Sequence, residues 1–307
     1  MAKKKNKTLP IVVAAVAVVG VVGGVIAWRM SKGNEPAMEE EAPTTRRRIS
    51  VPTNVIAISE RPYIEVIPFT GREGRSLRIV IETIEKDAKE AEYVLETEVG
   101  GASAKNAAGR DIGVPETENP VGLQGSMGIV DISSLPAQAE SLLGSCSAGG
   151  ACIHYSGLGG GRVQITFSGG GENYAVASGF NYIENTSRTQ TKATSKDGLF
   201  TIEGKALERL QNYVITNSAG LPSGLEGEVI EVNDEENERD GAKVVLAYQL
   251  SSTETAPSGT MTVTIEGEGV IYAYDKKTKA WTALETEMSA GVASAQTEWA
   301  DIFALVR

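Results

Sequence analysis

The sequence predicts a mainly β protein in which an N-terminal transmembrane helix is followed by two β-sandwich-like domains. The helix is predicted by one long apolar run at residues 9–28. The β domains are predicted by short segments behind that run, in which apolar and polar residues alternate with a period of two. Glycine runs separate these segments, as is typical of tight turns between antiparallel strands.

The apolar run from Leu9 to Trp28 has the length of a membrane span. At about 1.5 Å of rise per residue, such a helix covers roughly 30 Å, the thickness of the hydrocarbon core of a bilayer. The alternative, a cleaved signal peptide, has a shorter apolar region and small residues at its cleavage site. This run ends instead in Trp28 and Arg29, an aromatic residue and a cation that suit the membrane interface. We therefore expect a retained helix whose partner is the lipid bilayer.

The basic residues around the run predict its orientation. Lysines at positions 3, 4, 5 and 7 precede it, whereas Arg29 and Lys32 are the basic residues that follow it closely. Because positive residues are enriched on the cytoplasmic side, we expect the tail of residues 1–8 in the cytoplasm and the later domains outside it. Arg46–Arg48 lie near the limit of this rule and weaken the count. Gly20 and Gly24 have the spacing that lets two membrane helices pack closely, so a homo-oligomer is a further hypothesis.

The chain has two cysteines, Cys146 and Cys152, and five small residues separate them. This spacing lets their Cα atoms come within disulfide distance, so an exported domain would form a bridge here. In a reducing cytosol the two thiols would stay unpaired. A third interpretation makes Cys146 a nucleophile with His154 as its base, although Cys152 would compete as a partner thiol. Zinc is not expected, because it needs about four ligands and only His154 is near.

The composition excludes several classes of function. The formal net charge is -11, with a single histidine in 307 residues. Nucleic-acid binding needs a basic surface, so we expect no nucleic-acid partner. No cofactor motif is present, and the Gly157–Gly161 and Gly169–Gly171 runs are interpreted as turns. The acidic stretch Asn233–Asp240 lacks the glycine that a calcium-binding EF-hand loop requires at its sixth position, so we interpret it as a hairpin loop.

The domain layout follows from composition. Residues 29–54 combine prolines with runs of like charge and predict a disordered stalk. A first β-rich domain is expected at 55–185 and a second at 198–307, separated by the polar stretch that ends at Asp197. Helix is expected in the anchor and at 205–211, and a long loop at 100–125. In chain order, the predicted strands are 61–68, 77–82, 93–99, 128–132, 162–167, 174–177, 180–183, 199–203, 213–217, 228–232, 243–250, 260–266, 270–274, 281–285, 291–295 and 302–306.

Two short motifs carry a resemblance. Ile202-Glu203-Gly204 leads into alternating strands, and Ala256-Pro257-Ser258-Gly259 forms a turn between them. Residues 198–267 thereby resemble IPT/TIG-type immunoglobulin-like domains of bacterial surface proteins. The tail after Val270 is similar to a closing module of such proteins. That module often carries a His-Phe-Ser element where this chain has Glu298–Phe303, so the autoproteolysis associated with the element is not implied. The resemblance implies an Ig-like fold for the second domain.

These observations predict a structural, adhesive or binding role in the cell envelope, with a protein or glycan as partner. The sequence identifies no catalytic residues and favours a role other than catalysis. One alternative is an anchored hydrolase of cell-wall material or peptides, built on paired carboxylates. Another is a subunit of an envelope complex. A carbohydrate-binding face is also considered, although aromatic residues of strands usually lie in the core; its candidates are Tyr63, Tyr155, Tyr174, Tyr182, Trp281 and Trp299.

Overall fold

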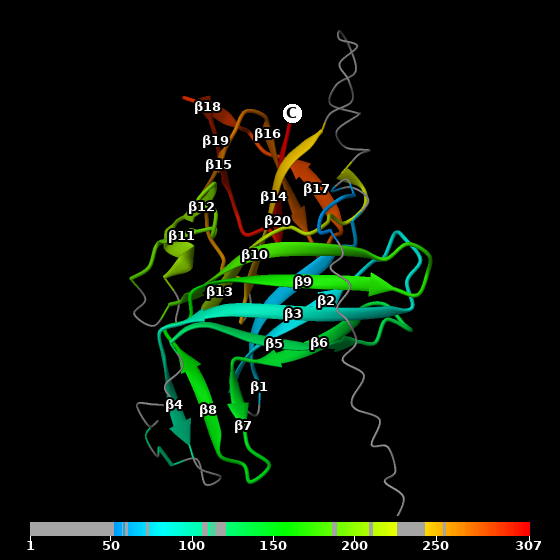
Figure 1. The fold of residues 1–307 in the computed structure, drawn as a ribbon. Coiled ribbons are helices and arrows are strands. Elements are labelled where there is room, and N and C mark those ends of the chain that lie inside the picture. Colours follow the sequence, from blue (N-terminus) through cyan, green and yellow to red (C-terminus); the bar gives the residue numbers. More distant parts are fainter. Residues whose placement is uncertain are drawn as a thin grey trace, which may run out of the picture. The chain divides into compact units, whose positions relative to one another are not determined.

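A central antiparallel sheet joins the first and second halves of the described chain (Figure 1). The computed structural model describes residues 52–56, 58, 61–71, 74–105, 110–111, 113, 121–185, 189–208, 211–225, 243–253 and 256–307. Within these residues the protein is mainly β, as predicted. They include no helix long and apolar enough to cross a membrane. The predicted cytoplasmic tail, anchor, Gly20–Gly24 pair and most of the stalk lie outside them.

Nine strands of the described chain form the central sheet. In spatial order they are β17 (Ala280–Ala283), β16 (Val270–Asp275), β20 (Ile302–Val306), β14 (Val244–Ser252), β13 (Asn212–Asn217), β10 (Tyr174–Glu184), β9 (Gly160–Ser168), β3 (Glu90–Val99) and β5 (Gly122–Val130).

Three smaller sheets accompany it among the described residues. The first side sheet is β1 (Ile64–Gly71), β2 (Gly74–Ile81) and β6 (Ala137–Leu142). The second side sheet is β11 (Lys192–Thr194), β12 (Phe200–Glu203), β15 (Met261–Glu266), β19 (Val292–Thr297) and β18 (Glu287–Ser289). The third, called the ribbon, is β4 (Gly101–Lys105), β8 (Cys152–Ser156) and β7 (Gly144–Cys146).

The two side sheets pack on opposite faces of the central sheet. In β13, Val214 belongs to the core shared with β1 and β2, whereas Tyr213 and Ile215 belong to the core shared with β12 and β15. Strands covered on both faces lose the alternation of apolar and polar residues. All five residues of β20, Ile302–Val306, are accordingly buried.

The two main cores divide near residue 183, although the central sheet does not. The first core is built mostly from residues 64–182, and the second core from residues 183–305. The central sheet nevertheless continues from β10 to β13, with Ile183 opposite Tyr213. Residues 55–185 and 198–307 therefore contribute to one sheet, and whether each folds independently stays a prediction.

Several elements differ from the sequence-based expectation. The predicted loop at 100–125 contains β4 and the start of β5. The expected strands at 174–177 and 180–183 are one strand, β10, because Gly179 continues the pairing with β9. In the segment where helix was expected, residues 205–207 form a short 3-10 helix. The sequence did not predict β6, β7, β8, β11 and β18; apart from β8, these strands contain few large apolar residues. The expected strand at 228–232 lies outside the described residues.

A disulfide between Cys146 and Cys152 closes the hairpin of β7 and β8. The two residues lie directly opposite each other in the ladder, with a Cα–Cα distance of 4.1 Å. The structure thus contains the bridge that the spacing predicted. The ribbon extends from one end of the central sheet (Figure 1).

Residues 53 and 54 run along the edge of β10. Thr53 forms a parallel bridge with Ala175. The Asn54 side chain binds the backbone of Ala177 twice: its Nδ2 donates to the carbonyl oxygen at 2.9 Å, and its Oδ1 accepts from the amide at 3.0 Å. These contacts attach the first described residues to the central sheet.

Gly161 provides a test of packing between β9 and β10. A Cβ at this position would lie 2.1 Å from Cζ of Phe180 and 2.3 Å from the carbonyl oxygen of Glu96. We predict that Gly161→Ala lowers the free energy of unfolding by about 1–3 kcal/mol, because an overpacked core forces neighbouring groups to shift. Chemical denaturation measures this change.

Gly179→Ala is the matched control. Its added Cβ would find its nearest neighbours at 3.8 and 3.9 Å, ordinary contact distances. Equal stability of the two variants would show that Phe180 does not lie against Gly161 as described.

Candidate functional site

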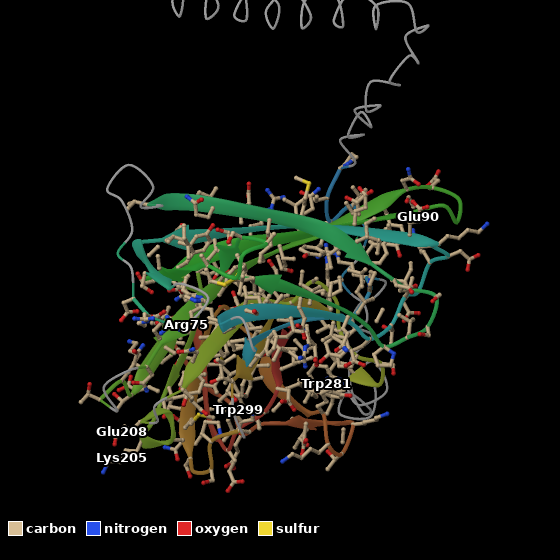
Figure 2. All side chains as sticks on the ribbon, turned by 90° about the horizontal axis from the view of Figure 1, so that it is seen from below. Arg75, Glu90, Lys205, Glu208, Trp281 and Trp299 are labelled. Carbon is tan, nitrogen blue, oxygen red and sulfur yellow. A yellow bond between two sulfur atoms is a disulfide. The ribbon has the colours of Figure 1, made fainter. Side chains whose placement is uncertain are left out.

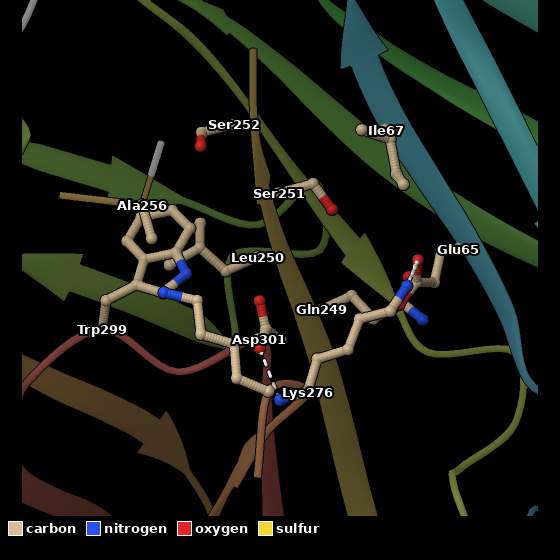
Figure 3. Close-up of a pocket in the computed structure, with 11 residues that line it drawn as sticks. Glu65, Ile67, Gln249, Leu250, Ser251, Ser252, Ala256, Lys276, Trp299 and Asp301 are labelled. Carbon is tan, nitrogen blue, oxygen red and sulfur yellow. Dashed lines mark hydrogen bonds and ion pairs between the residues drawn. The ribbon is translucent and has the colours of Figure 1, made fainter. Parts of the chain in front are cut away.

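A pocket of about 330 Å³ lies between β1, β14, the turn after β16 (Val270–Asp275) and the segment before β20 (Figure 3). Trp299 and Glu65 lie on opposite sides of it, with Gln249–Ser252 of β14 between them. We call it the Trp299 pocket. Its lining residues are Glu65, Ile67, Gln249, Leu250, Ser251, Ser252, Ala256, Lys276, Lys277, Trp299 and Asp301.

The Glu65 carboxylate forms the polar floor of the pocket. Alternation along β1 places Ile64 and Val66 in the first core and turns Glu65 to the other face, where the residue is 6% exposed. Its Oε1 accepts a hydrogen bond from the Tyr63 hydroxyl, and its Oε2 accepts one from Lys276 Nζ at 2.6 Å. Both carboxylate oxygens are thus engaged, as a buried charge requires.

The pKa values of Lys276 and Tyr63 show how strongly both side chains interact with the Glu65 carboxylate. Desolvation alone would lower the pKa of Lys276, but hydrogen bonds and Coulombic attraction to Glu65 and Glu82 outweigh it and raise that pKa. Lys276 Nζ also donates to Glu82 Oε1 at 2.8 Å. Burial, followed by the nearby Glu65 charge, raises the pKa of Tyr63 far above its ordinary value. Lys276 therefore remains a cation and Tyr63 a neutral donor across the physiological range.

Gln249 ties β14 to β1 directly beside this group. Its Nε2 donates to the Ile64 carbonyl oxygen at 2.6 Å, and the side chain is 2% exposed. Its Oε1 is buried and has no hydrogen-bond partner within the described part of the chain. We name Tyr63, Glu65, Gln249 and Lys276 the clamp, because they connect the first side sheet to strands of the second half.

Asp301 and Trp299 form the opposite side of the pocket. Asp301 Oδ2 accepts from the Lys276 amide at 2.8 Å, and the Asp301 carbonyl oxygen accepts from the Leu250 amide at 2.9 Å. The Trp299 indole is partly buried, and its ring centroid lies 6.1 Å from that of Tyr213. Packing therefore fixes the orientation of the indole at the pocket.

Of the six aromatic candidates, the structure brings Trp299 and Tyr63 close to this site. Tyr63, Tyr174, Tyr182 and Trp281 are buried. Tyr155 is half-buried on β8 of the ribbon. Figure 2 shows Trp281 and Trp299 on the side of the C-terminal strands, away from Glu90 at the start of β3. The six residues do not form a common face.

The cysteine–histidine arrangement does not form a thiol nucleophile in this structure. Cys146 is bonded to Cys152, so its sulfur carries no thiol. His154 lies opposite Ser103 and Gly144 in the ribbon. Over the described residues, no three His, Cys, Asp or Glu side chains gather closely enough to hold a metal ion. The Asn233–Asp240 loop lies outside the described part.

β5 presents a second feature, an apolar stripe on the last strand of the central sheet. Leu123, Met127 and Ile129 point to the same side of β5 and are 57%, 68% and 69% exposed. Glu92 and Glu98 of β3 lie opposite Ile129 and Leu123 in the ladder. An exposed aliphatic stripe of this kind is typical of a contact surface for another macromolecule.

Comparison with known proteins does not extend this description. No protein-family model matches the chain, and no curated protein matches it.

Sequence reasoning missed the clamp, although one signal pointed to it. Glu65 is the one charged residue within the apolar segment Tyr63–Phe69. A charge at that position needs a partner when the segment is buried. Its partner Lys276 is 211 residues away, so the sequence could suggest the need but not the partner.

Lys276→Met tests the clamp. The substitution leaves the buried Glu65 carboxylate without its cation, and we predict a loss of about 1–2 kcal/mol in the free energy of unfolding. This is less than the loss for a fully buried pair, because the Lys276 side chain is 43% exposed. Urea denaturation of both proteins measures it.

The stability loss of Lys276→Met should also depend on pH, in a direction set by the pKa of Lys276. Since the folded-state pKa of Lys276 is raised above 10.5, its contribution is complete below that pH and is lost as pH rises through the folded pKa. The stability difference should therefore stay constant from about pH 6 to 9 and shrink at higher pH. Lys277→Met, which changes an exposed side chain, is the control. An equal loss in both variants would contradict the clamp.

Proposed function

We propose that the chain is a single-pass, membrane-anchored protein that presents its β domains outside the cytoplasm and binds a partner in the cell envelope. The proposal combines the apolar run at 9–28 with the ligand-sized Trp299 pocket and the disulfide of the ribbon. Its N-terminus would lie in the cytoplasm.

One observation carries the binding role: the buried carboxylate of the pocket and the candidate nucleophile Cys146 are already engaged. Both Glu65 oxygens hold hydrogen bonds, and the Cys146 sulfur is part of a disulfide. A general acid or nucleophile must instead be available to a substrate. A pocket with fixed polar groups and an aromatic wall suits recognition.

The disulfide supports the location. Disulfides form and persist in oxidising compartments and are rare in the cytosol. A bridge that closes a hairpin of the ribbon is what an exported domain would carry.

The resemblance to IPT/TIG-type domains of surface proteins enters the same proposal. Ile202 lies in β12 opposite Val263 of β15. A Cβ on Gly204 would come within 2.9 Å of the Thr260 carbonyl oxygen, so the first motif lies against the residue that follows the 256–259 turn. The two motifs thus adjoin in space.

A hydrolase is the first alternative, because Glu65 and Asp301 line the same pocket. Paired carboxylates are the usual catalytic groups of glycosidases. Release of new reducing ends from a cell-wall glycan by the full-length chain, abolished in Asp301→Asn, would favour this alternative.

A subunit of an envelope complex is the second alternative. The apolar stripe of Leu123, Met127 and Ile129 favours it, since such a stripe is suited to a protein contact. Loss of a defined complex from native membranes in a Leu123→Lys variant, but not in the likewise exposed Val270→Lys control, would support it.

The cysteines provide the test of location. We predict that Cys146 and Cys152 are bonded in protein isolated from native envelope under conditions that trap free thiols. Alkylation followed by mass spectrometry distinguishes the bonded pair from two alkylated residues.

Protease treatment of intact cells, with any outer membrane permeabilised, is the companion measurement. It should digest the chain beyond Ser31. Free thiols together with full protection from protease would overturn the proposed topology.

A further inference from the structure

We propose that the Trp299 pocket binds a short segment of a neutral saccharide. The inference deepens the proposed binding role and rests on it for the compartment in which the ligand is met. Three observations support it: the formal charges around the pocket balance, the Trp299 indole lines one side, and several hydrogen-bonding groups at the pocket are available to a ligand.

The charges of the lining residues balance. Two carboxylates, Glu65 and Asp301, and two ammonium groups, Lys276 and Lys277, line the pocket, so their formal charges sum to zero. A cationic ligand would meet the two lysines, and an anionic ligand would meet the two carboxylates. An uncharged ligand with many hydrogen-bonding groups avoids both conflicts.

Trp299 supplies the apolar surface that such a ligand needs. A pyranose ring has a face of C–H groups that packs on an aromatic ring, while its hydroxyls project around the edge. Tyr213 and the second core hold the indole in place, so little side-chain freedom is lost when a ligand packs on it. Ile67 of β1 adds a partly exposed aliphatic side chain on the other side.

Hydrogen-bond donors and acceptors that could bind sugar hydroxyls lie around the Trp299 indole. Asp301 uses Oδ2 to hold the Lys276 amide, and its Oδ1 has no partner within the described residues. The Lys277 side chain is exposed and forms no ion pair with a described residue. Ser251 contributes a hydroxyl that can donate and accept. This mixture matches sugar hydroxyls, which also donate and accept.

Alternative occupants fit less well. A peptide strand would need a free sheet edge, but Gln249 is paired with Thr216 of β13 and Ile302 of β20, and the Leu250 amide already donates to the Asp301 carbonyl oxygen. A purely apolar ligand would leave Asp301 and Lys277 desolvated without compensation. A volume of about 330 Å³ is at the small end of ligand pockets, which suits one or two sugar units.

The experiment uses the full-length chain in lipid nanodiscs, with binding followed by tryptophan fluorescence and by saturation-transfer NMR. Chitotriose, maltotriose and cellotriose are titrated to millimolar concentration, and we expect saturable binding of at least one. Binding of chitotriose alone identifies an N-acetylated cell-wall glycan as the source. Binding of maltotriose or cellotriose identifies a neutral hexose polymer. The deacetylated, cationic trimer of glucosamine should bind more weakly than chitotriose, and the reverse order would overturn the charge argument.

Variants then assign the site. We expect Trp299→Ala to weaken binding at least tenfold and Lys277→Ala to weaken it several-fold, with melting temperatures recorded for each. Because Trp299 also packs on Tyr213, Lys277→Ala and Trp299→Phe keep the test valid if Trp299→Ala does not fold. Tyr155→Ala, a half-buried aromatic outside the pocket, should bind as the wild type does.

The absence of saturable binding by all three neutral trimers overturns the proposal. Binding unchanged in a folded Trp299→Ala or Lys277→Ala variant overturns it as well. Cys146 and Cys152 could still be bonded in the envelope in either case, so the saccharide site and the exported location fail separately.

Discussion

The buried carboxylate of Glu65 is the interaction on which the junction between the first side sheet and the C-terminal strands depends. It lies on a strand of the first side sheet and receives hydrogen bonds from Tyr63 and Lys276. Gln249 adds a bond from β14 to the backbone of β1. These contacts replace the water that a carboxylate loses on burial, and because they span the sequence they also fix where β1 lies relative to β14 and β16. Glu65, Gln249 and Lys276 also line the Trp299 pocket, so these contacts hold one side of it in place.

The central sheet explains how one chain carries two cores without separating into two independent layers. The first side sheet covers one face and the second covers the other, so β10 and β13 contribute to both cores. The pocket lies between β1 of the first side sheet, the end of β14 and the segment before β20. Its polar groups Glu65, Gln249 and Lys276 are also the groups that join the first side sheet to strands of the second half.

How well each part could be predicted depends on how far apart its interacting residues lie in the sequence. Strands such as β3 and β19 show local alternation and were anticipated, and the disulfide followed from a spacing of six residues. β20 and β16 were anticipated as well, among the short segments separated by turn signals, but the structure shows that their middle residues are buried on both faces. The clamp was not anticipated, because Glu65 and Lys276 are 211 residues apart and Gln249 binds a carbonyl 185 residues away. The site is thus a product of topology, which residue patterns do not specify. Trp299 was among six aromatic candidates, and burial separates it from most of the others.

The contact of residues 53 and 54 with β10 has a mechanical consequence. A pull on the chain from its amino-terminal side reaches the fold through the Thr53–Ala175 bridge and the two bonds of Asn54 to Ala177. At this point β10 pairs with β9 on one side, and residues 53 and 54 occupy its other side, because β13 pairs with β10 only at Phe180–Glu184. A tensile load that arrives at Ala175–Ala177 therefore passes first into the β9 ladder and reaches the β13 ladder farther along β10. The load is thus carried along β10 before it reaches the rest of the central sheet.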